Sequence, residues 1–185
     1  MRGLLEALSV LTAEAVSQTR QQVRPRRTSS PYRSLPDHVA AVCYRVRGRE
    51  IEFLLVKTRA GRWTFPKGRV ENDFTRAAAA AREAVEEAGA YVRVDFHPFT
   101  RYVHAKNPEW NNSPQEHLVD AHLCEVIDRG APEEDYRNPT WFSVERSKLR
   151  LNRKRSSVYG KELAKVVDRA IVHILRRHTS GDHRQ

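Results

Sequence analysis

A segment bounded by two glycines contains charged side chains whose spacing suits metal chemistry. The sequence from Gly68 to Gly89 reads GRVENDFTRAAAAAREAVEEAG and places Glu83, Glu86 and Glu87 in a predicted helix. Residues three and four positions apart share one face of a helix, so the three carboxylates are expected to lie together. They repel each other unless a cation neutralises them, and Mg²⁺ accepts carboxylates together with waters and phosphates. The segment therefore predicts a divalent-metal site, with a solvated acidic face as the alternative.

The opposite face of the same helix is predicted to be apolar and to pack on a sheet. This stripe consists of Phe74, Ala77, Ala78, Ala81, Ala84, Val85 and Ala88. We expect Phe74 to be largely buried within it. Asp73 or Thr75 is expected to cap the start of the helix, and Gly89 to close it in the left-handed conformation. Such packing would hold the acidic face in a fixed position.

The segment resembles the Nudix box of the Nudix hydrolase family, whose pattern is G-x5-E-x7-R-E-U-x-E-E-x-G-U, with U a bulky aliphatic residue. The positions that match in identity and register are Gly68, Arg82, Glu83, Glu86, Glu87 and Gly89. The preceding Trp-x-Phe-Pro-Lys-Gly, which starts at Trp63, also resembles the strand and loop leading into the box. Three positions depart from the pattern: Phe74 replaces the first glutamate, and Ala84 and Ala90 replace larger aliphatic residues.

The resemblance implies an α/β fold of the Nudix type, an α/β/α sandwich with a central mixed β-sheet. In the family the first glutamate of the box supports the loop by pairing with the box arginine. Because Phe74 stands in its place, we expect Glu71 to pair with Arg82 instead. The replacement by Phe74 therefore puts the support of the loop before the helix in question more than it does metal binding.

The activity implied by the resemblance is metal-dependent hydrolysis of phosphoanhydride bonds in nucleoside diphosphate-linked or polyphosphorylated substrates. The metal would be Mg²⁺ or Mn²⁺, held by Glu83, Glu86 and Glu87, with a backbone carbonyl from Gly68. Arg82 would orient a carboxylate. The general base is open between a box glutamate and a carboxylate on another loop, where the candidates are Glu116, Glu133 and Glu134, with a slight preference for Glu116.

Basic side chains flank the box and are candidates for binding substrate phosphates. Lys67 directly precedes the box, and Arg59 and Arg62 precede Trp63. A second cluster contains Arg150, Arg153, Lys154 and Arg155, for which a solvated lead-in to the last helix is an equal alternative. Trp110 would stack on a base or pack on the sheet. The histidines His104, His117 and His122 lack paired metal spacing and are expected to be structural.

The whole chain is strongly basic. It has 185 residues, with 33 Lys plus Arg against 23 Asp plus Glu, a net charge of +10 and a pI near 10.1. Such an excess favours anionic partners, either polyphosphorylated small molecules or RNA. Dinucleoside polyphosphates and diphosphoinositol polyphosphates are the favoured substrates. The alternatives are an RNA 5′-pyrophosphohydrolase and a non-catalytic Nudix-fold module that binds nucleotides or nucleic acid.

Neither a membrane span nor a disulfide framework is predicted. No run approaches the ~20 apolar residues that span a bilayer. Glu6 and Glu14 argue against a secretory or transit peptide at the N-terminus, so a cytoplasmic location is expected. Cys43 and Cys124 lie in apolar runs and are expected to be buried reduced thiols. The oligomeric state is open.

Three regions are predicted along the chain. Residues 1–36 form an N-terminal helix and a basic linker containing proline and serine, residues 37–178 form the Nudix hydrolase domain, and residues 179–185 form a tail. Strands are expected over 39–44, 51–57, 63–65, 92–96, 117–127 and 140–144, and a last helix over 157–177; residues 101–104 either extend the strand over 92–96 or begin the next one. Residues 106–115 and 128–139 are expected to be loops.

Overall fold

The computed structural model describes residues 36–106, 115–153, 155 and 157–181. A compact unit starts at Pro36. The predicted N-terminal helix and linker therefore lie outside the described residues, except for Pro36, and so do Trp110 and Lys154. No helix within the described residues is long and apolar enough to cross a membrane.

The described residues form an eight-stranded mixed sheet. The strands are β1 (His38–Arg47), β2 (Glu50–Lys57), β3 (Trp63–Thr64), β4 (Lys67–Arg69), β5 (Ala90–Val94), β6 (Thr100–Lys106), β7 (Gln115–Arg129) and β8 (Thr140–Ser143). The helices are α2 (Arg76–Ala88), α3 (Val144–Asn152) and α4 (Ser157–Gly181), and a 3₁₀ turn, η1 (Asp135–Arg137), precedes β8. Most predicted elements are present, with ends that differ by a few residues.

Two central strands, β1 and β7, run parallel and organise the sheet. On its side away from β1, β7 pairs with β6 along its first part and with β5 along its last part. On its side away from β7, β1 likewise pairs with β4 near its start and with β2 near its end. Central strands are buried on both faces and therefore read as continuous apolar runs, which is the pattern of residues 39–44. This split pairing places the short strand β4 beside the start of β1.

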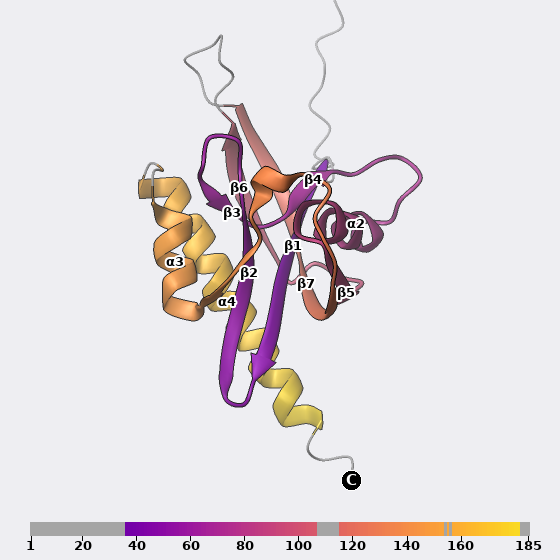
Figure 1. The fold of residues 1–185 in the computed structure, drawn as a ribbon, viewed down its shortest axis with the longest axis vertical. Helices are drawn as coiled ribbons and strands as arrows, with labels where there is room; N and C mark the ends of the chain where they lie inside the picture. Colours follow the sequence, from indigo (N-terminus) through magenta and orange to yellow (C-terminus); the bar gives the residue numbers. More distant parts are fainter. Residues whose placement is uncertain (1–35, 107–114, 154, 156, 182–185) are drawn as a thin grey trace, which may run out of the picture. The chain divides into compact units, whose positions relative to one another are not determined.

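Helices cover both faces of the sheet, with α2 on one face and α3 and α4 on the other (Figure 1). The core under α2 includes Val39, Ala41 and Leu54, together with the alanines of the helix. The core on the other face includes Val42, Phe53, Tyr102, Leu163 and Ile174. Cys43 and Cys124 are buried without a disulfide bond. The predicted α/β/α sandwich and the buried reduced thiols are confirmed.

Several elements differ from the sequence expectation. The sequence predicted neither β4 nor α3, and α4 ends at Gly181 instead of Arg177. Only Ser147 and Leu151 of α3 are buried, so this helix has too narrow an apolar stripe to stand out from the surrounding basic sequence. The segment expected to be a loop over 128–139 begins with the end of β7 and contains η1.

Candidate active site

The helix of the box is held in place by its two caps and by an alanine face. The Thr75 hydroxyl accepts a hydrogen bond from the Ala78 N–H at 3.2 Å, so Thr75 and not Asp73 is the cap. Gly89 has a φ of 59°, and its N–H bonds to carbonyls of the last turn. The buried positions are Ala77, Ala79, Ala80, Ala84, Glu87 and Ala88. The apolar stripe is therefore rotated from the predicted one, since Ala78, Ala81 and Val85 are only half-buried.

This rotation brings Glu87 to the edge of the core, where it is only 7 % exposed. Its Oε2 accepts a hydrogen bond from the Lys67 backbone N–H at 3.1 Å. Its Oε1 forms an ion pair with the Arg137 guanidinium, which also contacts Glu134 Oε2 at 2.8 Å. Because buried carboxylates are costly unless they are paired, these contacts explain how Glu87 is accommodated between α2 and β4.

The Glu83 carboxylate lies directly against Gly68 of β4. A β-carbon added at Gly68 would stand 1.7 Å from Glu83 Oε1 and 2.3 Å from its Cδ. Only glycine lets the strand approach the carboxylate this closely. Glu83 forms no ion pair with any of the described residues, whereas Glu86 and Glu87 each have an arginine partner.

Arg82 ties the loop before the helix to the helix itself. Its Nη1 lies 2.9 Å from Glu71 Oε2, and its Nε donates to Glu86 Oε1 at 2.5 Å. The predicted pairing of Glu71 with Arg82 is thus confirmed. The prediction that Phe74 is buried is wrong, because this side chain is 40 % exposed and lies 5.4 Å below the Arg82 guanidinium. Phe74 precedes the cap at Thr75, so the helical periodicity that placed it on the apolar stripe does not extend to it.

The electrostatics of Glu83 favour a bound cation. Burial, followed by the nearby Glu87 and Glu86 carboxylates, raises the pKa of Glu83 to about 7. Burial also raises the pKa of Glu87, against the opposing effect of Lys67 and Arg137. A divalent ion would relieve this repulsion at Glu83, which forms no ion pair among the described residues and is only partly offset by the nearby Lys67 and Arg82. The donor set therefore fits Mg²⁺ or Mn²⁺.

A second group of polar side chains lies near Lys67. Burial lowers the pKa of the Lys67 ammonium, whose electrostatic neighbours include Glu87, Arg137 and Arg155. Burial and the cations Lys67, Arg155 and Arg62 also lower the pKa of His104 to about 3, so its imidazole is neutral. The Tyr102 hydroxyl is buried and has no hydrogen-bond partner among the described residues. A buried hydroxyl without a partner is costly, and a ligand atom would relieve that cost.

The predicted phosphate-binding residues are spread over different environments. Gly61, Arg62, Trp63, Arg150 and Arg153 line a pocket of about 130 Å³ between the β2–β3 turn and the end of α3. Arg155 instead donates to the backbone carbonyls of Leu151, at 2.5 Å, and Trp63, at 2.6 Å. Burial lowers its pKa to about 10. These bonds tie the end of α3 to β3 and favour a structural role for Arg155 over a phosphate clamp.

The structure separates the candidates for the general base. Glu116 accepts a hydrogen bond from the Tyr159 hydroxyl at 2.7 Å, and no contact among the described residues joins it to the box carboxylates. Glu134 is linked to Glu87 through the shared Arg137, and it also pairs with Arg59 at 3.4 Å. The loop geometry therefore favours Glu134 over Glu116 as the neighbour of the site.

Arg137 is the residue of the site that sequence reasoning missed. It lies in η1, in a segment expected to be a plain loop, and its side chain is only 15 % exposed. The Glu133 N–H donates to the Glu86 carbonyl at 2.9 Å, which fixes this segment against α2. The only local signal for a role of this segment was the pair of adjacent acids Glu133 and Glu134, which does not point to Arg137 itself.

The sequence and the layered fold are matched by known proteins. A family model described as the NUDIX domain matches residues 36–161. The chain belongs to the NUDIX domain family. This membership confirms the predicted family and enzyme class, a pyrophosphohydrolase of the Nudix type.

Solved structures with the Nudix fold resemble this protein at low sequence identity. A complex of the Caenorhabditis elegans Ap4A hydrolase matches with a TM-score of 0.55 and 19 % identity, covering 76 % of this chain and 98 % of that one. The Bacillus subtilis pyrophosphohydrolase BsRppH matches with a TM-score of 0.51 and 18 % identity, covering 78 % and 85 %. The NUDIX domain of Shewanella oneidensis NrtR, complexed with ADP ribose, matches at 0.55 and 10 %, covering 88 % and 97 %. At these identities the likeness shows the fold.

Proposed function

We propose that this Nudix protein uses a divalent metal ion to hydrolyse phosphoanhydride bonds in small molecules that carry several phosphates. The observation that carries the proposal is the close contact of the Glu83 carboxylate with Gly68, next to the buried Glu87. Glu83, Glu86 and Glu87 would hold Mg²⁺ or Mn²⁺, and the Gly68 carbonyl remains a predicted ligand. A bound ion supplies charge neutralisation on the phosphoryl oxygens and on the leaving group.

Other residues of this chain would bind the substrate and position the carboxylates. The Lys67 ammonium, whose electrostatic neighbours include Glu87, Glu83 and Arg155, would bind a phosphate oxygen. The Tyr102 hydroxyl, which lacks a partner among the described residues, would bond to the same substrate. Arg137 would hold Glu134 and Glu87 in their relative positions. Such preorganised groups stabilise developing charge without reorganising during the reaction.

Dinucleoside polyphosphates are the favoured substrates, followed by diphosphoinositol polyphosphates. The pocket lined by Arg62, Arg150 and Arg153 offers three cations beside the Trp63 ring, which suits a long polyphosphate or a nucleotide at its far end. The likeness to an Ap4A hydrolase supports the first class. The net charge of +10 fits both classes.

A substrate panel tests the proposal. The chelator-treated protein would be assayed with Mg²⁺ or Mn²⁺ on dinucleoside polyphosphates, diphosphoinositol phosphates, ADP-ribose, damaged nucleotides and triphosphorylated RNA. We expect metal-dependent turnover that is fastest on a dinucleoside polyphosphate. Glu83→Gln and Glu87→Gln should each lower kcat by at least about 10²-fold, while Glu125→Gln, which changes an exposed carboxylate paired with Arg93, should not.

The other outcomes separate the alternatives. Faster turnover of triphosphorylated RNA, with affinity that falls steeply with salt, would identify an RNA 5′-pyrophosphohydrolase. Nucleotide binding without turnover of any substrate would identify a binding module. Parent-like turnover in both glutamine variants would refute the assignment of the site.

A further inference from the structure

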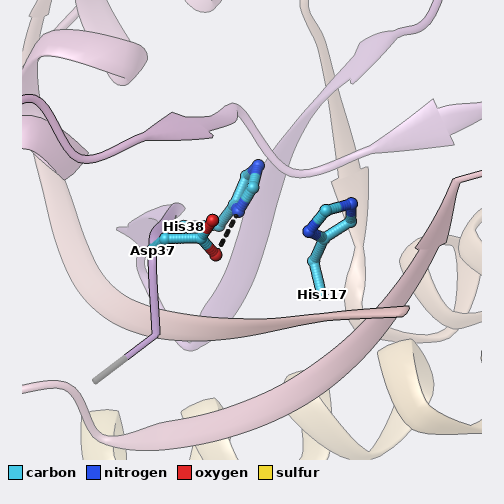
Figure 2. A group of neighbouring side chains, drawn as sticks. All are labelled: Asp37, His38 and His117. Atoms are coloured by element: carbon cyan, nitrogen blue, oxygen red, sulfur yellow. Dashed lines mark hydrogen bonds and ion pairs between the residues drawn. The ribbon is translucent and has the colours of Figure 1, made fainter. Parts of the chain in front are cut away.

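Three metal-ligating side chains that are distant in the sequence meet where β1 begins. Asp37 and His38 lie at the start of β1, and His117 lies in the first part of β7; Figure 2 shows the carboxylate and the two imidazoles facing one another. The His38 Nδ1 is 2.8 Å from Asp37 Oδ1, and the centroids of the two rings are 4.6 Å apart. One ligand atom from each residue lies within 4.8 Å of the other two.

This cluster and the box carboxylates belong to opposite faces of the sheet. Successive residues of a strand point to opposite faces. Val39 packs in the core under α2, so its neighbour His38 points to the face that carries α3 and α4. Val119, two residues after His117, packs in the core of that same face. The cluster therefore lies on the face opposite α2, where His117 is directly across the ladder from His104, one of the polar side chains described near Lys67.

The chemistry of the cluster differs from that of the box. Mg²⁺ prefers oxygen ligands in an octahedral shell, whereas imidazole nitrogens with one carboxylate suit Zn²⁺ and similar first-row cations. We propose that Asp37, His38 and His117 bind one such divalent transition-metal ion, with water completing its coordination. The site would join the start of β1 to β7.

Small side-chain movements would complete the site. With metal–nitrogen distances of about 2.0–2.1 Å, neighbouring ligands of a tetrahedral zinc ion lie about 3.4 Å apart. The ligand atoms are already within 4.8 Å of one another, and the Asp37 side chain is 50 % exposed. Arg69 lies 3.7 Å from Asp37 Oδ2 and is 76 % exposed, so it can leave the carboxylate without burying its charge.

The consequence of binding follows from the strand pairing. In the ladder, β1 residue His38 is opposite Val119 of β7 on one side and Arg69 of β4 on the other. An ion that links His38 to His117 adds a cross-link between β1 and β7 at the end of the ladder. Because it binds the folded state alone, it should raise the melting temperature in proportion to the logarithm of its concentration.

The experiment uses the full-length, tag-free, chelator-treated protein in a Glu87→Gln background, so it does not depend on hydrolytic activity. Zn²⁺ is added during calorimetric titration and thermal unfolding, and Co²⁺ is added to record the visible spectrum. We expect one equivalent of Zn²⁺ to bind, with a rise in melting temperature and a Co²⁺ spectrum typical of low coordination number. His38→Gln and His117→Gln should each weaken binding at least tenfold, while Asp37→Asn weakens it less.

A matched control changes the exposed His97 to Gln and should leave Zn²⁺ binding unchanged. Circular dichroism would establish that each variant is folded. Zn²⁺ affinity that is equal in His38→Gln, His117→Gln and the parent would overturn the proposal. The absence of any Zn²⁺ binding by the folded parent would overturn it as well.

Discussion

Replacing Gly68 with alanine should misplace the Glu83 carboxylate while leaving the fold intact. The added β-carbon would stand 1.7 Å from Glu83 Oε1, whereas real β-carbons essentially never come within 3.0 Å of another heavy atom. The carboxylate must therefore move by about 1.3 Å, which is the difference between these two distances. It is the far end of a flexible side chain, so the movement requires no change in the backbone.

The expected effect is large on catalysis and small on stability. A misplacement of about 1 Å at a reacting centre can cost about 10²-fold in rate, which corresponds to about 2.7 kcal/mol of transition-state stabilisation. Gly68 does not have a positive φ, so alanine adds no backbone strain there. We expect kcat/KM to fall about 10²-fold and the melting temperature to stay within a few degrees of the parent.

The assays are steady-state kinetics with Mg²⁺, Mn²⁺ titration followed by electron paramagnetic resonance, and thermal unfolding. Gly130→Ala is the matched control, because its β-carbon would meet the Tyr91 ring at 3.6 Å, an ordinary contact. If Gly68→Ala retained the kcat/KM and Mn²⁺ affinity of the parent, the close approach of Glu83 to β4 would not contribute to metal binding or catalysis, and the reasoning would be refuted.

Three further predictions concern the same site. Arg137→Ala removes the cation paired with Glu87, so divalent ions should bind more tightly in a Mn²⁺ titration. For the metal-free protein, the contribution of Glu83 to the melting temperature, measured as the difference between the parent and Glu83→Gln, should fall as the pH rises from about 4.5 to about 7, while His104 contributes the opposite trend to both proteins. The reason is that the folded state holds a proton on Glu83 over this range, whereas the unfolded chain releases it near pH 4.5. Phe74→Glu should change the free energy of unfolding by less than about 0.5 kcal/mol and leave kcat unchanged, because the side chain is exposed and Arg82 already has two carboxylate partners.

Each of these predictions has its own control and contrary result. Arg93→Ala, which removes the arginine of an exposed ion pair, should not alter Mn²⁺ affinity, and weaker binding in Arg137→Ala would contradict the first prediction. The difference in melting temperature between the parent and Glu83→Gln should change with pH between about 4.5 and about 7; a difference that does not depend on pH would contradict the second prediction. A faster Phe74→Glu enzyme would show that the phenylalanine impairs the box.

The sequence by itself determined the local part of the site. Glu83, Glu86 and Glu87 share a helical face because their spacing matches the helical repeat, and this depends on no distant residue. The end of α2 follows in the same way from Gly89, a glycine able to adopt a left-handed conformation, whereas its start was left open between Asp73 and Thr75 until the structure showed Thr75 as the cap. The continuous apolar run of β1 likewise indicated a strand buried on both faces.

Only the tertiary structure decided which distant side chains meet these local elements. Arg137 reaches Glu87 because η1 is fixed against α2, and Arg155 turns inward to the backbone of β3. His117, expected from its spacing to be structural, lies against His38 because β1 and β7 pair in parallel with a particular register. Strand register and loop placement depend on how the two cores pack, so they bring together residues whose separation in the sequence carries no periodic signal.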